Sequence, residues 1–227
     1  MFQPRTTLLA LAATGTLLLS GCGAGAPGVA VRLDGDSIPM SQVEQVVETM
    51  CSKKVAALWL QGNTVTGASQ KSQVAIGLAF SRLADAFAEE QDLDQQALAR
   101  TLGPARTEIQ GLVGDVDEAT QENLLAQQKL YAVRDLAGRT ALVAEGAPGE
   151  GGTDDAATAK GADLMTAWLA EQDVEFDPRL GVELRDGQIA FSDSTASFPV
   201  SDLARAASAD EPAAEYVGSL PENQRCG

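Results

Sequence analysis

Three cysteines, Cys22, Cys51 and Cys226, are the residues of this 227-residue chain with the most obvious chemistry. A thiolate is a nucleophile that accepts acyl-type groups, and two thiols that come together form a disulfide. The sequence contains no histidine, which is the usual general base near neutral pH and the commonest transition-metal ligand. No serine, cysteine or lysine has a recognisable base beside it in the sequence. We therefore expect no enzyme activity, no cofactor and no metal site.

Cys22 closes a short apolar run. Residues 7–19 contain only Leu, Ala, Thr and Gly, and one basic residue, Arg5, precedes them, as in a secretory signal. The Leu-Ser-Gly-Cys tetrapeptide at 19–22 resembles the lipobox of bacterial lipoproteins. The resemblance implies cleavage after Gly21 and acylation of Cys22 by diacylglyceryl and palmitate chains. The protein would then be lipid-anchored to the cell membrane on its extracytoplasmic face.

An uncleaved transmembrane helix is the alternative for the same run. The run is too short to span a bilayer, and residues 23–28, Gly-Ala-Gly-Ala-Pro-Gly, follow without a charged stop-transfer flank. Those features favour a signal peptide that spans residues 1–21, followed by a lipid-anchor linker that spans residues 22–28. Because each buried methylene contributes about 0.8 kcal/mol, two long acyl chains would hold the protein at the membrane far longer than one.

The remaining chain is strongly acidic. Since residues 1–21 contain only Arg5 among charged residues, 15 basic residues remain against 32 acidic ones. This charge excludes nucleic acid as an expected partner and repels anionic lipid headgroups, so the acyl anchor would have to hold the protein at the membrane.

Acidic clusters at 34–36 and 115–118 lack the spacing of a calcium loop, and turn and helix-cap roles explain them.

Cys51 and Cys226 remain as an even pair once Cys22 is acylated. In an oxidising compartment such a pair favours a disulfide, which would staple the end of the chain to an early helix. The alternative is two free thiols, with Cys51 acting as a small core hydrophobe.

The order of predicted elements indicates a mainly helical fold. Gln127 and Gln128 interrupt the apolar side of the longest helix. The expected elements in this half are a strand at 29–33 with an Asp34-Gly35 turn, a helix at 41–61 opened by a Ser41/Glu44 capping box, a helix at 69–91, short helices after Asp94 and Pro104, and a long helix at 117–139.

Shorter elements are expected in the second part of the chain. Residues 145–160 contain no large apolar side chain and predict a flexible linker. A helix at 163–171, a strand at 174–176 and a hairpin at 182–191 should follow. Residues 192–227 form a C-terminal tail, in which a short helix is expected at 201–209.

Two stretches in this order resemble the chaperone module of SurA-like and PrsA-like secreted proteins. They are residues 31–38 (VRLDGDSI) with the helix that follows, and residues 174–181 (VEFDPRLG). The resemblance covers residues 29–191. It implies a helical bundle closed by a small β-sheet of N-terminal and C-terminal strands, and binding of extended or unfolded polypeptide by the bundle.

The same resemblance argues against isomerase activity. Family members often carry a parvulin prolyl isomerase domain between the long helix and the last helix, and here that position holds only residues 145–160. The family's catalytic pocket commonly uses histidines, which this chain lacks. The tail after residue 191 lies outside the resemblance.

These observations predict a membrane-anchored, chaperone-like lipoprotein that binds exported unfolded or extended polypeptides without chemistry. Trp59 and Phe80, chosen from helical periodicity, are the expected residues of its apolar groove. The alternative is a structural or adaptor lipoprotein that recruits one folded envelope protein.

Overall fold

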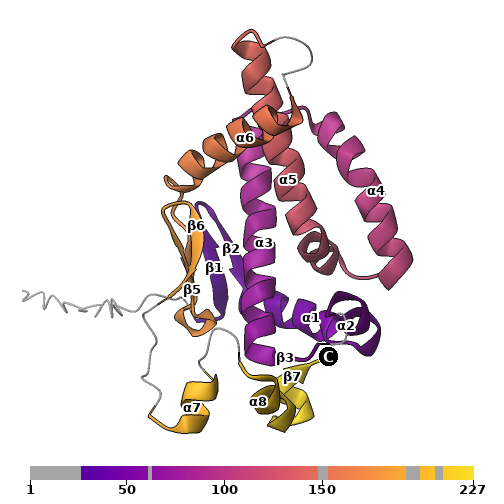
Figure 1. The fold of residues 1–227 in the computed structure, drawn as a ribbon, viewed down its shortest axis with the longest axis vertical. Helices are drawn as coiled ribbons and strands as arrows, with labels where there is room; N and C mark the ends of the chain where they lie inside the picture. The colour runs from indigo at the N-terminus through magenta and orange to yellow at the C-terminus, as the bar shows by residue number, and fades with distance from the viewer. Residues whose placement is uncertain (1–26, 61–62, 148–152, 193–199, 208–211) are drawn as a thin grey trace, which may run out of the picture.

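The computed structural model describes residues 27–60, 63–147, 153–192, 200–207 and 212–227. Within these ranges the chain is mainly helical with small antiparallel sheets, as the sequence predicts (Figure 1). Cys22, the signal peptide expected at 1–21 and nearly all of the linker expected at 22–28 lie outside the described residues.

The helices are α1 (Met40–Met50), α2 (Lys53–Trp59), α3 (Gly67–Glu90), α4 (Gln95–Val113), α5 (Glu118–Ala144), α6 (Asp154–Leu169), α7 (Asp202–Ala207) and α8 (Ala214–Ser219), with short 3-10 helices η1 (Pro178–Leu180) and η2 (Glu222–Gln224). The strands are β1 (Val29–Leu33), β2 (Asp36–Pro39), β3 (Val65–Thr66), β4 (Glu175–Phe176), β5 (Val182–Arg185), β6 (Gln188–Phe191) and β7 (Arg225–Cys226).

Helix α3 is the centre of the fold. Figure 1 shows it between the β1–β2 strands on one side and α5, with α4 beyond, on the other. Its buried residues, among them Val74, Leu78 and Phe87, belong to a core that also contains residues of the sheet and of α5. Figure 1 also shows α6 crossing from the upper end of α5 toward the β5–β6 hairpin.

Strands from the two ends of the predicted domain pair with each other. The three-stranded sheet has the order β2-β1-β4, with Val31 opposite both Ile38 and Phe176. The β1–β2 hairpin turns at Gly35, whose φ of +76° lies in the region that glycine adopts without strain. A small sheet of N-terminal and C-terminal strands, expected from the resemblance, is therefore present.

The second resembling stretch forms a tight turn after β4. Asp177 is buried, and its carboxylate accepts hydrogen bonds from the backbone N–H and the guanidinium of Arg179. The side-chain hydrogen bond from Arg179 lowers the pKa of Asp177, against the opposing effect of burial. Gly181 ends the turn with a left-handed φ of +65°, and the Ser72 hydroxyl donates to the Leu180 carbonyl at 2.7 Å. This turn ties the sheet to α3.

The helices expected after Asp94 and from Asp117 begin at these residues, and each aspartate is the N-cap of its helix. The Asp94 carboxylate accepts from two backbone N–H groups at the start of α4, and the Asp117 carboxylate accepts from Thr120 at the start of α5. The prediction of a capping box at Ser41 and Glu44 is wrong. Pro39 holds the N-cap position of α1, so Ser41 already lies inside the first turn, and no side chain caps this helix.

Two helix boundaries differ from the prediction. The helix expected at 41–61 is divided at Cys51 and Ser52, because Ser52 is extended and restarts the chain as α2. Conversely, α4 continues through Pro104 instead of beginning again there. Pro104 is exposed, and the carbonyl that loses its donor belongs to exposed Arg100, where solvent is accessible.

The prediction of a flexible linker at 145–160 is partly wrong. Helix α6 begins at Asp154, where the Thr153 hydroxyl accepts from the backbone N–H of Ala156 and two aspartates favour the positive helix end. Small residues allow this segment to pack closely against α5, which composition alone does not reveal. Residues 148–152 of the expected linker lie outside the described residues.

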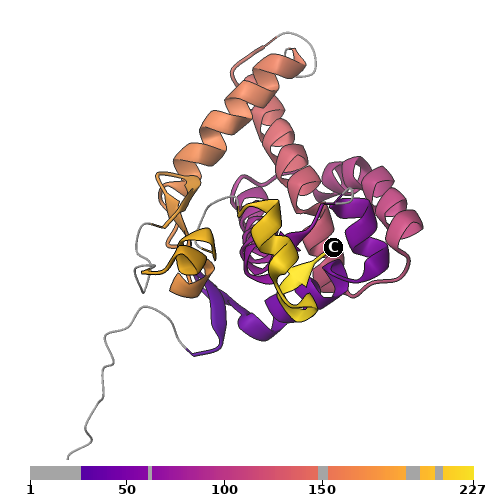
Figure 2. The same cartoon turned by 60° about the horizontal axis from the view of Figure 1, so that its bottom comes forward.

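The C-terminal segment folds back onto the body of the protein. Strand β7 pairs antiparallel with β3, with Val65 opposite Cys226. Figure 1 shows α8 and β7 (yellow) below the lower end of α3, and in Figure 2, where this end comes forward, they lie in front of the helices. Part of the tail expected at 192–227, with a helix at Asp202–Ala207, is described, whereas residues 193–199 and 208–211 are not.

Candidate binding groove

A cavity of about 610 Å³ lies between α3 and α5 and is bordered by α2 and β3. We call it the α3–α5 groove. Its volume is typical of ligand pockets in proteins. Residues from five elements line it, including Met50 of α1, Trp59 of α2, Val65 of β3, Gln70, Gln73, Gly77 and Phe80 of α3, and Asn123, Gln127, Gln128, Tyr131 and Arg134 of α5.

Helical spacing brings the α5 residues to the groove. Asn123, Gln127, Tyr131 and Arg134 follow one another at intervals of three or four residues, so their side chains share one face of the helix. The Asp117 cap fixes where α5 begins. The lining of the groove is therefore set by the register of α5 against α3.

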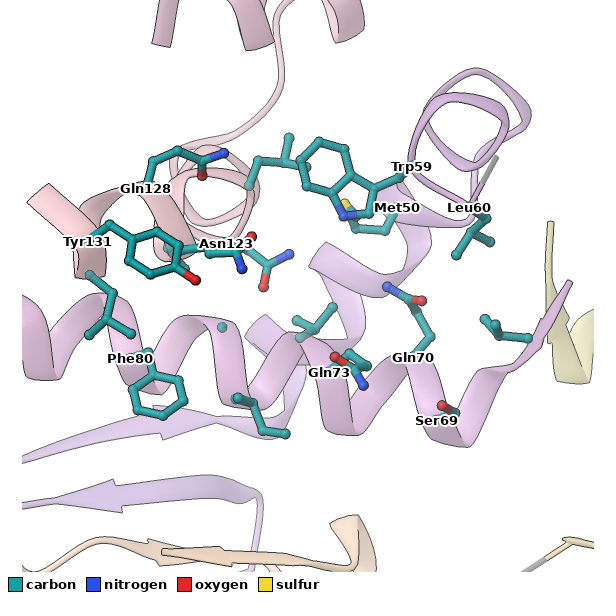
Figure 3. Close-up of a pocket in the computed structure, with 18 of the residues that line it drawn as sticks. Met50, Trp59, Leu60, Ser69, Gln70, Gln73, Phe80, Asn123, Gln128 and Tyr131 are labelled. Carbon is teal, nitrogen blue, oxygen red and sulfur yellow. The ribbon is translucent and has the colours of Figure 1, made fainter. Parts of the chain in front are cut away.

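Aromatic side chains with large exposed areas border the groove. Trp59 is 44% exposed and Tyr131 is 49% exposed, and both line the cavity. Figure 3 shows the two rings approaching the space between α3 and α5 from α2 and from α5. Exposed aromatic rings beside a concave surface supply large contact area for a ligand at low conformational cost.

Trp59 and Phe80, the groove residues predicted from helical periodicity, line the same cavity. They are not equivalent. Phe80 is half-buried and packs against the hydrophobic core, and Figure 3 shows its ring turned to the strand side of α3, away from Tyr131. Trp59 is therefore the cleaner position at which to alter the groove without disturbing the core.

Side-chain amides form the polar part of the lining. They are Gln70, Gln73, Asn123, Gln127 and Gln128. Each amide offers both donors and an acceptor, and none of the five forms a side-chain hydrogen bond within the described part of the chain. Their hydrogen-bonding capacity is therefore available to an occupant of the groove.

Glycine at position 77 makes room for one of these amides. A Cβ atom at Gly77 would lie 2.3 Å from the Asn123 side-chain oxygen. The Asn123 amide consequently lies over the bare backbone of α3, near the middle of the groove (Figure 3).

Arg134 is the only charged residue among the groove lining given by the described residues. Its guanidinium carbon lies 4.9 Å from the centre of the Tyr131 ring, within the range of a cation–π contact. Its Nε atom is buried and has no hydrogen-bond partner in the described structure. A positive group is thus held at the Tyr131 end of the groove.

A disulfide stabilises the opposite end. Cys51 and Cys226 are bonded, with their Cα atoms 4.8 Å apart, as the even pair of cysteines predicts. Met50, next to Cys51, and Val65, paired with Cys226, both line the groove. The disulfide therefore joins the C-terminal strand to the segment between α1 and α2, and strand pairing joins the same strand to β3.

Other clusters of polar residues have structural roles. Asp34 belongs to the β1–β2 turn and Asp117 caps α5. Within the described ranges, no group of three or more Cys, Asp or Glu side chains is placed to hold a metal ion. Trp168 is buried in the core, where its ring packs edge-on against Phe87 and its indole N–H donates to Glu90 at 2.7 Å.

Comparison of the chain with protein-family models, with curated proteins and with solved structures finds no match. The SurA-like and PrsA-like resemblance therefore stays a prediction. Among the described helices, none combines the length and the apolarity that crossing a bilayer requires.

The sequence analysis missed Tyr131, Arg134 and the amides as groove residues. One signal was present: Gln127 and Gln128 interrupt the apolar stripe of their helix, and both line the groove. The position of Arg134 had no comparable signal, because an arginine on a long helix is usually solvated.

Proposed function

We propose that this chain is a membrane-anchored extracytoplasmic lipoprotein that binds exported unfolded or extended polypeptides in the α3–α5 groove, without isomerase or other enzyme activity. The observation that carries the proposal is the combination, in one cavity, of exposed aromatic rings with side-chain amides that have no hydrogen-bond partner among the described residues.

This combination suits a polypeptide. An extended chain presents alternating N–H and C=O groups, and amides that can both donate and accept satisfy them whatever the sequence. Trp59 and Tyr131 would contact the apolar side chains, which unfolded polypeptides expose and folded ones bury. Binding would thus select the unfolded state rather than a particular sequence.

Anchoring rests on Cys22 and the lipobox-like tetrapeptide, which lie outside the described residues. Replacing Cys22 by Ser removes the nucleophile that would take the diacylglyceryl group. We expect Cys22→Ser to lose labelling by a clickable palmitate analogue and to move from the membrane to the soluble fraction. Absence of lipid on the wild-type protein would contradict the anchor.

The binding function is tested by suppression of client aggregation. The mature domain, carrying the disulfide, is mixed with several unrelated proteins that are unfolding, and light scattering is recorded. We expect the double variant Trp59→Ser/Tyr131→Ser to require about tenfold more protein for the same suppression of aggregation. Aromatic anchors at binding surfaces each contribute on the order of 1 kcal/mol. Leu112→Ser is the matched control, because Leu112 is 46% exposed but does not line the groove.

Two results would contradict the proposal. Equal suppression by the groove variant and the Leu112 control would separate binding from the groove. Failure to suppress aggregation of any client, together with crosslinking in intact cells to one folded envelope protein, would favour the adaptor interpretation instead.

A further inference from the structure

We propose that the α3–α5 groove binds polypeptide segments that carry a carboxylate, and that Arg134 binds this carboxylate. The inference rests on the proposed function and specifies its ligand class. It is carried by the placement of one cation, which has no carboxylate partner among the described residues, in a groove whose other described lining residues are uncharged.

Most basic side chains among the described residues form an ion pair with a carboxylate. The chain has 32 acidic and 16 basic residues, so acidic side chains that could pair with a basic one are in excess. Lys71 pairs with Glu44 at 2.8 Å, and Arg139, five residues after Arg134 on α5, pairs with Asp135 at 2.8 Å. Arg134 has no carboxylate partner among the described residues.

The Arg134 side chain is also held in position. Its Cγ atom lies 3.1 Å from where a Cβ of Gly161 would be, so the stem packs against α6 at a glycine. Its guanidinium lies 4.9 Å from the Tyr131 ring centre. A guanidinium that is oriented before binding loses less conformational freedom when it forms hydrogen bonds.

The geometry of the guanidinium supplies the chemical reason for a carboxylate. Arg134 lines the groove, and the fork of N–H groups of an arginine matches the two oxygens of a carboxylate. A neutral carbonyl would satisfy one N–H but not the charge. A phosphate would also match the fork, but the rest of the lining, with its aromatic and aliphatic side chains and amides, suits a peptide.

The carboxylate could be the C-terminus of a client or an Asp or Glu side chain within it. Both present the same group to Arg134, and three fluorescently labelled hexapeptides distinguish them. All have an apolar sequence and a blocked N-terminus. The first has a free C-terminal carboxylate, the second a C-terminal amide, and the third a C-terminal amide with one central residue replaced by Glu.

The experiment measures dissociation constants by fluorescence anisotropy with the disulfide-bonded mature domain. We expect at least one carboxylate peptide to bind about tenfold more tightly than the uncharged amide, as for a charge-assisted hydrogen bond. Arg134→Gln should abolish this difference, and Arg134→Lys should restore part of it. Arg106→Gln is the control, since Arg106 is exposed on α4 and lies outside the groove.

Each outcome decides the inference. A preference for the free C-terminus alone identifies chain ends as ligands, and a preference for the Glu peptide identifies acidic segments. Equal affinity of all peptides, unchanged by Arg134→Gln, would overturn the carboxylate inference while leaving polypeptide binding intact. Failure of every peptide to bind would overturn both. Matching thermal unfolding curves for Arg134→Gln and the parent protein exclude loss of fold as the cause.

Discussion

Helix α5 meets its two neighbours in opposite ways. Toward α6 it presents Gly138, and the two backbones approach so closely that a Cβ at Gly138 would lie 1.9 Å from the Ala157 carbonyl oxygen. Toward α3 it presents amides and Tyr131, and a cavity of about 610 Å³ stays open between the helices. Small residues close one contact, and long polar side chains keep the other open.

The difference indicates a division of roles within one helix. At the α5–α6 contact the backbones approach closely, and Gly161 likewise meets the Arg134 carbonyl. The α3–α5 contact combines a packed base, with Leu124 in the core, and an open upper lining. We expect substitutions at the first contact to change stability and substitutions at the second to change binding.

Removing the disulfide should have the largest effect on the groove side. The bond encloses a loop with a sequence separation of 175, for which the chain-entropy model gives an upper estimate of about 5 kcal/mol. We expect the Cys51→Ala/Cys226→Ala variant to lose about 4 kcal/mol of unfolding free energy in urea. Hydrogen exchange should increase most in α2 and β3. A loss below about 1 kcal/mol would mean that the tail contributes little to the fold.

Adding a methyl group at the close contact should cost nearly as much. In Gly161→Ala the new Cβ would meet the Arg134 carbonyl oxygen at 1.8 Å, so backbone must move. We expect a loss of about 3 kcal/mol in unfolding free energy, measured by urea denaturation. Gly111→Ala in α4 is the matched control, because nothing lies within 4 Å of its Cβ position. A similar result for both variants would contradict the close α5–α6 packing.

The turn that ties the sheet to α3 should respond to acid. Because Arg179 lowers the pKa of Asp177 in the folded state, the carboxylate stabilises the protein above its unfolded pKa of about 4. That stabilisation is lost as the pH falls through the lower folded pKa. We expect Asp177→Asn to lose about 1–2 kcal/mol at pH 7 and to flatten the decline of stability in acid. Asp163→Asn, at an exposed position on α6, should leave both the stability at pH 7 and its decline in acid unchanged.

Local patterns predicted the elements that depend on local chemistry. The helix-capping aspartates, the Asp34-Gly35 turn and the hairpin at 182–191 all follow from residue types a few positions apart, and the structure contains them. Helix α3 was predicted within two residues at each end for the same reason. The pairing of Cys51 with Cys226 needed only an even number of thiols.

Boundaries set by tertiary contacts could not be read from the sequence. Residues 154–160 resemble a linker because they are small, yet being small is what allows α6 to lie against α5. The groove was foreseen only through Trp59 and Phe80. Its amides and Arg134 depend on how α5 is rotated against α3, which is fixed by packing rather than by local sequence.

Gly77→Ala should have the smallest effect on stability and distinguishes the two faces of α5 most directly. The new Cβ would lie 2.3 Å from the Asn123 side-chain oxygen, a close approach like those at Gly138 and Gly161, but to the end of a side chain that can rotate. Since alanine also favours the helix by about 1 kcal/mol over glycine, we expect unfolding free energy to change by less than about 1 kcal/mol. The displaced amide should weaken binding of the uncharged hexapeptide about threefold, a fraction of one hydrogen bond. Destabilisation equal to that of Gly161→Ala would show instead that Asn123 cannot move and that α3 and α5 are packed as tightly as α5 and α6.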